Sequence, residues 1–262
     1  MAKIVLAHGF LGFGTFGNDK VSYFNGVQAA YEKAGHEVLA ERVAALGSIE
    51  QRAGQLVGHI QKRWGTTTDD IFMIGHSMGG LDCRRIIATH AEIGPRVARL
   101  ITICTPHFGS PVATAVHTAT GPLWDAIPWL LRAGINGMFK DDQGALKDLC
   151  VRPALQDSDV EGVEYLRVGA DPGFTFLPSW LFSLSQGILA ITKERNDGVV
   201  TLSSASAGGP LLGKPWKVDH GGAIGWPTNA LGVPAVRKPP ADHVARYVGL
   251  LGPLLQPRIK KP

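Results

Sequence analysis

Several features that mark other classes of protein are scarce or missing in this 262-residue chain. Its three cysteines, Cys83, Cys104 and Cys150, form no C-x-x-C pair and cannot all pair with one another. Free thiols in a reducing compartment are therefore the simplest interpretation. No stretch approaches the ~18 uninterrupted apolar residues of a transmembrane helix. There is no internal repeat and no low-complexity linker, so we expect a single domain over residues 1–262.

The first residues carry no recognisable export signal. Met1 is followed almost at once by the apolar run Ile4–Ala7, without a basic segment, a long apolar core or a small-residue cleavage site. We therefore expect residence in the cytoplasm, or export by a route that needs no cleavable signal peptide.

Charge is also sparse, at 18% of residues against 45% hydrophobic residues, which excludes disorder and a coiled coil and leaves ample material for a core. The formal net charge is +4, and the densest basic cluster is Arg258, Lys260 and Lys261 near the last residue. Such a cluster is typical of a solvated tail, so no nucleic-acid partner is expected.

What the chain does contain is an alternation of short apolar runs with longer segments of helical period, which predicts an α/β fold with a mostly parallel sheet flanked by helices. The predicted strands are Lys3–Ala7, Glu37–Val43, Asp70–Ile74, Val97–Ile103 and Val163–Val168, and the predicted helices are Ser22–Ala34, a helix capped by Ser48 that runs to about Trp64, and Met78–His90. The alternation stops between Pro106 and Gln156, where apolar residues are interrupted by Pro and Gly.

The segment Gly75–Gly79 matches G-x-S-x-G between a predicted strand and a predicted helix, the setting of a nucleophile elbow. Ser77 is therefore the candidate nucleophile, although a serine N-cap beside turn glycines would give the same letters. The amide after the nucleophile, that of Met78, is one candidate donor to an oxyanion. The Phe10 amide, in the loop after the first strand, is the other, and His8 is expected to shape that loop.

Seven of the nine histidines precede residue 120, and in α/β-hydrolases the acid and then the histidine follow the serine along the chain, which leaves His220 and His243. We favour His220, which lies in a loop pattern, over His243, which lies in a helical pattern and is expected on a surface turn of the last helix. For the acid we favour Asp197, in a turn that leads into an apolar, strand-like run. Asp171, just past a predicted strand, is the rival, and Asp219 is too near His220 in sequence to orient its ring.

Together these segments resemble the bacterial true lipases of the Pseudomonas and Proteus type. The resemblance is carried by Ile4–Phe13, Gly75–Gly80, Thr105–Ser110, Asn196–Gly198 and Asp219–His220. It implies an α/β-hydrolase fold with Ser77, Asp197 and His220 as the catalytic triad.

The resemblance also implies a helical lid inserted within residues 111–160, with Trp124–Phe139 as its centre, although these aromatic residues would equally suit an ordinary core. Apolar side chains near the expected site favour acyl chains over polar substrates. The candidate substrate-binding residues are Phe13, Phe108, Trp124 and Trp129.

Members of that family bind a structural calcium ion, for which this chain lacks the expected acidic ligands. Gly222 stands where one ligand is expected, and Phe174–Ile191 offers no convincing second. We therefore expect no metal and no cofactor. The chain has no cysteines at the positions of the family's disulfide and no visible signal peptide, and in this it is similar to the subgroup of the family that lacks both.

Two other classes compete with this interpretation. Gly12–Gly17 is a literal G-x-G-x-x-G after a strand, with Glu37 about 20 residues on, which would suit a dinucleotide-binding oxidoreductase. Its predicted helix, however, begins only near Ser22, too late for that fold. A non-catalytic relative would be expected to have lost a member of the triad, and none is lost.

The sequence thus predicts a serine carboxylic-ester hydrolase, of lipase type, that cleaves acylglycerols or other medium- or long-chain esters through an acyl-enzyme. Contact with a lipid interface is expected, and the oligomeric state is left open. The same triad would serve a short-chain esterase, a polyester depolymerase, a thioesterase or an amidase.

Overall fold

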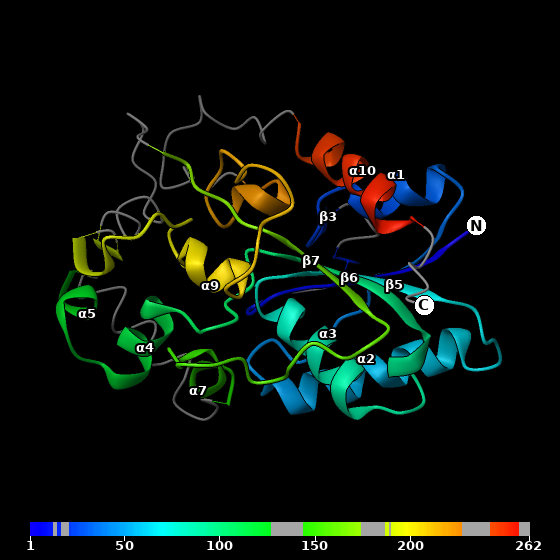
Figure 1. Cartoon of the computed structure of the whole chain (residues 1–262), viewed down its shortest axis with the longest axis horizontal. Helices are drawn as coiled ribbons and strands as arrows, with labels where there is room; N and C mark the ends of the chain where they lie inside the picture. The colour runs from blue at the N-terminus through cyan, green and yellow to red at the C-terminus, as the bar shows by residue number, and fades with distance from the viewer. Residues whose placement is uncertain are drawn as a thin grey trace.

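A five-stranded parallel sheet forms the centre of the computed structural model (Figure 1). The structure describes residues 1–12, 15–16, 21–126, 144–173, 187–188, 190–226 and 242–256. The strand order is β4-β1-β5-β6-β7, and every neighbouring pair is parallel. These strands are β1 (Lys3–Ala7), β4 (Glu37–Leu39), β5 (Ile71–His76), β6 (Val97–Ile103) and β7 (Glu164–Val168). A separate antiparallel pair is made by β2 (Thr15–Phe16) and β3 (Val21–Ser22).

Two pairs of helices cover the two faces of the sheet, with α1 and α10 on one side and α2 and α3 on the other (Figure 1). They are α1 (Val27–Lys33), α2 (Ile49–Trp64), α3 (Met78–Thr89) and α10 (His243–Leu254). Shorter elements are η1 (Gly94–Arg96), α4 (Pro111–Thr118), α5 (Pro122–Ala126), α7 (Gly144–Leu149), α9 (Leu202–Ser206) and η2 (Gly222–Ile224). No helix in the parts of the chain that the structure describes is long and apolar enough to cross a bilayer.

The core has two layers because side chains alternate between the faces of each strand. In β1, Ile4 and Leu6 pack beneath α1 and α10, whereas Val5 and Ala7 pack beneath α2 and α3. Both sets are buried, which explains why the predicted strands are continuous apolar runs rather than alternating ones.

The predicted strands and helices are present, several of them with shifted ends. Ser48 caps α2 as expected, since its hydroxyl accepts from the Gln51 amide at 3.2 Å. The helix predicted from Ser22 begins only at Val27, because Ser22 pairs with Thr15 in the β2-β3 hairpin. The strand predicted to reach Val43 ends at Leu39.

The predicted lid lies only partly within the described residues. Its first part forms α4 and α5 and its last part includes α7, but residues 127–143 lie outside the described residues. The lid therefore stays a prediction.

The three cysteines are free thiols, as the sequence predicts.

A buried arginine in the sheet holds the last helix. Arg99 of β6 is 2% exposed and donates through Nη1 to the carbonyls of Pro253, Leu254 and Gln256 at 2.7, 2.8 and 3.0 Å. Its Nε donates to Glu164 at 2.9 Å. Carbonyls at a helix C-terminus lack partners within the helix, so this guanidinium supplies donors that α10 cannot provide for itself.

We predict that Arg99→Met lowers the free energy of unfolding by about 2–4 kcal/mol, because buried acceptors at the end of α10 lose their donor. Urea denaturation followed by circular dichroism measures the change. Arg63→Met, on the exposed face of α2, is the control and should change stability by less than about 0.5 kcal/mol. Equal stability of the two variants would contradict the role assigned to Arg99.

Candidate active site

The candidate residues gather at the carboxyl edge of the sheet, where the strand order reverses. β1 is followed along the chain by β4 on one side of it and then by β5 on the other. In open α/β sheets, ligands bind outside the carboxyl ends of the strands at such a switch point. His8 follows β1 here, and Ser77 follows β5.

Ser77 lies in a strained turn between β5 and α3. Its backbone has φ 55° and ψ −130°, a conformation that residues other than glycine rarely adopt. The Ser77 amide donates to the carbonyl of Ile103 at 2.9 Å, which ties the turn to the end of β6. The residue is 6% exposed. This geometry is that of a nucleophile elbow rather than of a simple serine cap, since the Ser77 side chain makes no cap hydrogen bond to α3.

Glycines flank Ser77 because the backbones approach too closely for any side chain. A Cβ at Gly75 would lie 2.5 Å from backbone atoms of Gly80, and one at Gly79 would lie 2.2 Å from the carbonyl oxygen of Ala7. A Cβ at Gly80 would lie 2.1 Å from the Thr105 hydroxyl. The turn thus requires small residues at each of these positions.

Two backbone amides lie near this turn. Met78 is the first residue of α3, so its N–H is among those that have no acceptor within the helix. Phe10 lies in the loop after β1, where Gly12 donates to Gly9 at 3.1 Å and closes a tight turn. The His8 ring shapes this loop as predicted, because it bonds the Gly9 carbonyl at 2.9 Å and accepts from the Val43 amide at 3.0 Å.

A buried arginine clamps the same loop. Arg52 of α2 is fully buried and donates to the carbonyl of His8 at 2.6 Å and to that of Ala44 at 2.7 Å. Its Nε donates to Asp82 of α3 at 2.9 Å, so the buried cation has a buried counter-ion. The guanidinium therefore connects the loop after β1 to the helix that starts at the elbow.

Asp197 and His220 are brought together across 23 residues of sequence. The His220 Nδ1 lies 2.7 Å from Oδ2 of Asp197, whose carboxylate is 1% exposed. The other carboxylate oxygen accepts from the amides of Val199 and Val200 at 2.9 and 2.7 Å. Both oxygens are therefore fixed, and the acid can orient the imidazole and stabilise its protonated form. The strand expected after Asp197 is wrong, because the turn is closed by an isolated bridge and leads into α9.

The rivals have other partners. Asp171 forms an ion pair with Arg195, and Asp219 accepts from the Gly222 amide at 2.8 Å. The expectation that His243 lies on a surface turn is wrong. It is 7% exposed, and its Nε2 lies 2.6 Å from the Asn25 carbonyl, since α10 packs this side chain against the segment before α1.

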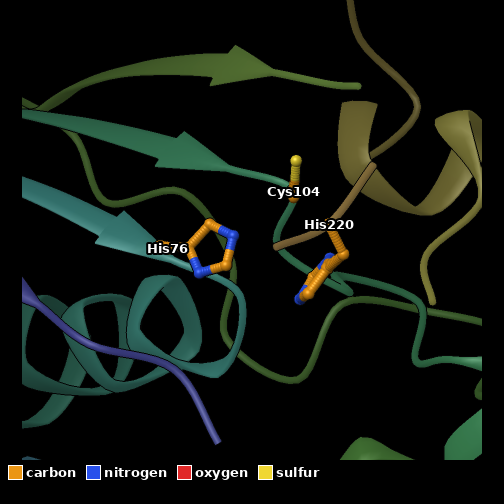
Figure 2. Close-up of side chains that lie close together, drawn as sticks. All are labelled: His76, Cys104 and His220. Carbon is orange, nitrogen blue, oxygen red and sulfur yellow. The ribbon is translucent and has the colours of Figure 1, made fainter. Parts of the chain in front are cut away.

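His76, Cys104 and His220 form a tight group behind the elbow, with one ligand atom of each lying within 4.8 Å of the others (Figure 2). Burial raises the pKa of the Cys104 thiol well above its usual value, and the charge of Asp197 and a hydrogen bond to it raise the pKa further. The thiol is therefore protonated and can donate to the Asp197 carboxylate.

The nitrogen and sulfur atoms of His76, Cys104 and His220 do not suit calcium, which takes oxygen ligands. Gly222 in η2 supplies no carboxylate, so the donors do not fit the ion that the family resemblance implies.

Two of the four predicted substrate-binding residues, Phe108 and Trp124, are among the residues that the structure describes. Phe108 lines a cavity of about 410 Å³ between α4, α5 and α9, together with Pro111, Ala115, Pro122 and Ile191. Trp124 is buried in a small cluster with Ala115 and Ile188. Phe13 and Trp129 lie outside the described residues. The roles of all four in substrate binding stay predictions.

Sequence reasoning missed Arg52 as a site residue. The available signal was an arginine on the apolar stripe of α2, between Ile49 and Leu56, where a charged side chain needs a buried partner.

The dinucleotide-binding alternative does not fit the structure. Thr15–Phe16 pairs with Val21–Ser22 in a hairpin after β1, and among the described residues the first helix begins only at Val27 rather than at the glycines, as a dinucleotide-binding unit requires.

Comparison with known proteins finds sequence similarity to lipases. Residues 41–126 match the PGAP1-like alpha/beta domain. The chain is 35% identical over 226 residues to triacylglycerol lipase 2 of Saccharomyces cerevisiae, covering 79% of this chain and 63% of that protein. It is 32% identical over 118 residues to a triacylglycerol lipase of Pseudarthrobacter phenanthrenivorans, covering 44% of this chain and 36% of that protein. The chain thus spans less than two thirds of these relatives.

Among solved structures, lipase 1 of Pelosinus fermentans superposes with a TM-score of 0.68 at 19% identity, covering 98% of this chain and 99% of that chain. Together with the parallel sheet, the elbow after β5 and the order of Ser77, Asp197 and His220 along the chain, this similarity shows that the chain has the α/β-hydrolase fold.

Proposed function

We propose that this chain is a serine carboxylic-ester hydrolase of lipase type. The observation that carries the proposal is the buried Asp197 carboxylate 2.7 Å from Nδ1 of His220, beside an elbow that holds Ser77 in strained geometry. The relatives from yeast and bacteria are triacylglycerol lipases, which supports an ester substrate. The finer assignment to the Pseudomonas and Proteus type is likewise a proposal, and it rests on the sequence motifs around Ser77, Asp197 and His220.

In the proposed mechanism His220, oriented by Asp197, removes the proton from Ser77 as the serine oxygen attacks the ester carbonyl. The amides of Met78 and Phe10 stabilise the oxyanion, and His220 then protonates the departing alcohol. Water enters and cleaves the acyl-enzyme by the same sequence of proton transfers. Asp197 stays ionised throughout and stabilises the imidazolium.

The proposed substrate is an acylglycerol or another ester with a medium or long acyl chain. The apolar lining that Phe108 shares with Pro111, Ala115 and Ile191 supports an acyl chain over a polar one. In this proposal residues 111–160 act as the lid over the entrance and contact the lipid interface.

The first prediction concerns Ser77. Wild-type protein is expected to hydrolyse p-nitrophenyl esters, with a maximum at medium or long chains in a C2–C16 series, and Ser77→Ala is expected to lose activity by several orders of magnitude. Activity should survive a chelator, because Gly222 and Phe174–Ile191 offer no carboxylate where the family resemblance implies the calcium ligands. Retained activity in Ser77→Ala would refute the nucleophile. Activity on C2–C4 esters alone would instead indicate a short-chain esterase, and activity on thioesters or polyesters alone would indicate those substrate classes.

The second prediction separates the two candidate acids. Asp197→Asn should lower kcat by about 10⁴-fold, because the amide NH2 would donate to Nδ1 of His220 and hold the imidazole in the wrong tautomer. Asp171→Asn removes an acid of similar burial whose partner is Arg195, and it should change kcat by less than about threefold. Steady-state kinetics on one ester measures both variants. A large loss in Asp171→Asn with little in Asp197→Asn would reverse the assignment.

The third prediction concerns the clamp on the oxyanion loop. Arg52→Met should lower kcat by about 10–100-fold, since the loop that carries the Phe10 amide loses its donor and small misplacements are costly. It should also destabilise the fold, because Asp82 is left buried without its counter-ion.

A second variant separates these two effects. Arg52→Met with Asp82→Leu should recover stability but not kcat, because the buried charge is gone while the clamp is still missing. Arg84→Met is the matched control, since Arg84 is equally buried and donates to Asp157 and Asp159 away from the site. Unchanged kcat in folded Arg52→Met would contradict the clamp.

A further inference from the structure

Two buried polar side chains behind the elbow take no part in the proposed mechanism. Tyr23 follows β3, and its hydroxyl lies 2.8 Å from Nδ1 of His76, the last residue of β5. Tyr23 is 8% exposed and His76 is 1% exposed. Burying polar groups is costly unless they bond to each other or to the backbone, so their place beside the site calls for an explanation in terms of the bonds that they make.

Both groups are neutral over the working pH range. Burial lowers the pKa of His76 well below its usual value, and the charge of His220 lowers it further. Burial likewise raises the pKa of Tyr23 above its usual value, while a hydrogen bond with the Gly9 backbone lowers it. A hydrogen bond lowers the pKa of a phenol when it stabilises the charged phenolate, which can only accept. The Gly9 amide therefore donates to the Tyr23 oxygen.

The direction of the remaining bonds follows from this. Because the Tyr23 oxygen accepts from Gly9, its own proton is free to go to Nδ1 of His76. A neutral imidazole that accepts at Nδ1 carries its proton on Nε2. The proton on Nε2 therefore needs an acceptor on the far side of the ring.

That side of the ring faces His220. The two imidazole rings lie 4.7 Å apart between centroids, and Figure 2 shows the His76 ring beside the segment that carries His220. Within the described structure, Nε2 of His76 is buried and has no partner at normal hydrogen-bond distance. Interaction with the His220 backbone favours the protonated His76 ring, which is the sign expected of a carbonyl acceptor.

We propose that Tyr23 and His76 are positioning residues that connect the oxyanion loop, the elbow and the histidine loop. The connection runs from the Gly9 amide through the Tyr23 hydroxyl and the His76 ring to the backbone of His220. Gly9 lies next to Phe10, and His76 lies next to Ser77, so one pair of side chains constrains all three parts of the site. This role rests on the proposed function, since it has meaning only if Ser77 and His220 react together.

The kinetic test uses a matched pair of tyrosines. Tyr23→Phe keeps the ring and removes the hydroxyl, and it should lower kcat about tenfold with little change in KM, because the lost bond positions the catalytic groups without contacting the substrate. Tyr31→Phe is the control. The Tyr31 hydroxyl also makes a buried bond, to the carbonyl of Tyr247 at 2.6 Å, but this bond joins α1 to α10 and contacts neither His76 nor His220. It should lose stability to a similar degree and keep its kcat.

Variants of His76 test whether the two residues act as one unit. His76→Phe should lower kcat at least as much as Tyr23→Phe, and the double variant should be no worse than His76→Phe alone. His76→Gln keeps an N–H near the position of Nε2 and should recover part of the lost kcat. Additive losses, no recovery in His76→Gln, or the same kcat in Tyr23→Phe and Tyr31→Phe would overturn the proposal.

Nuclear magnetic resonance of protein labelled with ¹⁵N-histidine gives a readout that does not depend on catalysis. The expected result is His76 protonated on Nε2 in the wild type, with an Nδ1 signal that shifts in Tyr23→Phe but not in Tyr31→Phe. A proton on Nδ1 would overturn the connection. Reaction of Ser77 with a fluorophosphonate distinguishes the two levels of failure. If the wild type does not react, the proposed function has failed, whereas a reactive wild type with an unchanged Tyr23→Phe removes only the positioning role.

Discussion

The close approach of backbones at the elbow is the constraint on which the rest of the site depends. Ser77 keeps its strained conformation only because the ends of β1, β5 and β6 press against the turn from different sides. The register of the sheet supplies that pressure, since it sets Ala7 beside Gly75 and His76 beside Ile103. A shift of one residue between these strands would break the hydrogen bond from the Ser77 amide to the Ile103 carbonyl. The reactive geometry is therefore a property of the whole sheet, whose two apolar layers hold the register.

Buried polar groups add the specificity that apolar packing lacks. Arg52 reaches from α2 to the loop after β1, and its counter-ion Asp82 lies in the helix that starts at the elbow. Tyr23 and His76 occupy the opposite side of the same turn. Such groups contribute little net stability, because desolvation offsets much of what their bonds provide. Their bonds have fixed directions, however, so they can hold loops at orientations that non-directional hydrophobic contacts leave undetermined.

Much of the fold could be predicted because its signals are local. A run buried on both faces has to be apolar throughout, so Val97–Ile103 was predicted with its correct ends. Ser48 marked the start of α2, since a hydroxyl before a segment of helical period accepts from a backbone amide of the first turn. The ends that were wrong depend on distant partners. Ser22 looks like a helix start but pairs with Thr15, and the region of Val43 is irregular because its amide bonds the His8 ring rather than a neighbouring strand.

Periodicity, glycine spacing and chain order were enough to predict the parallel α/β class, the turn that carries Ser77 and a few candidate acids and histidines. Which of these candidates meet depends on how the chain packs. Asp197 faces His220, whereas Asp171 is occupied by Arg195 and His243 is buried against Asn25. The physical reason is that a hydrogen bond depends on the distance between two side chains in space, and for residues far apart in sequence that distance is set by packing of the whole chain.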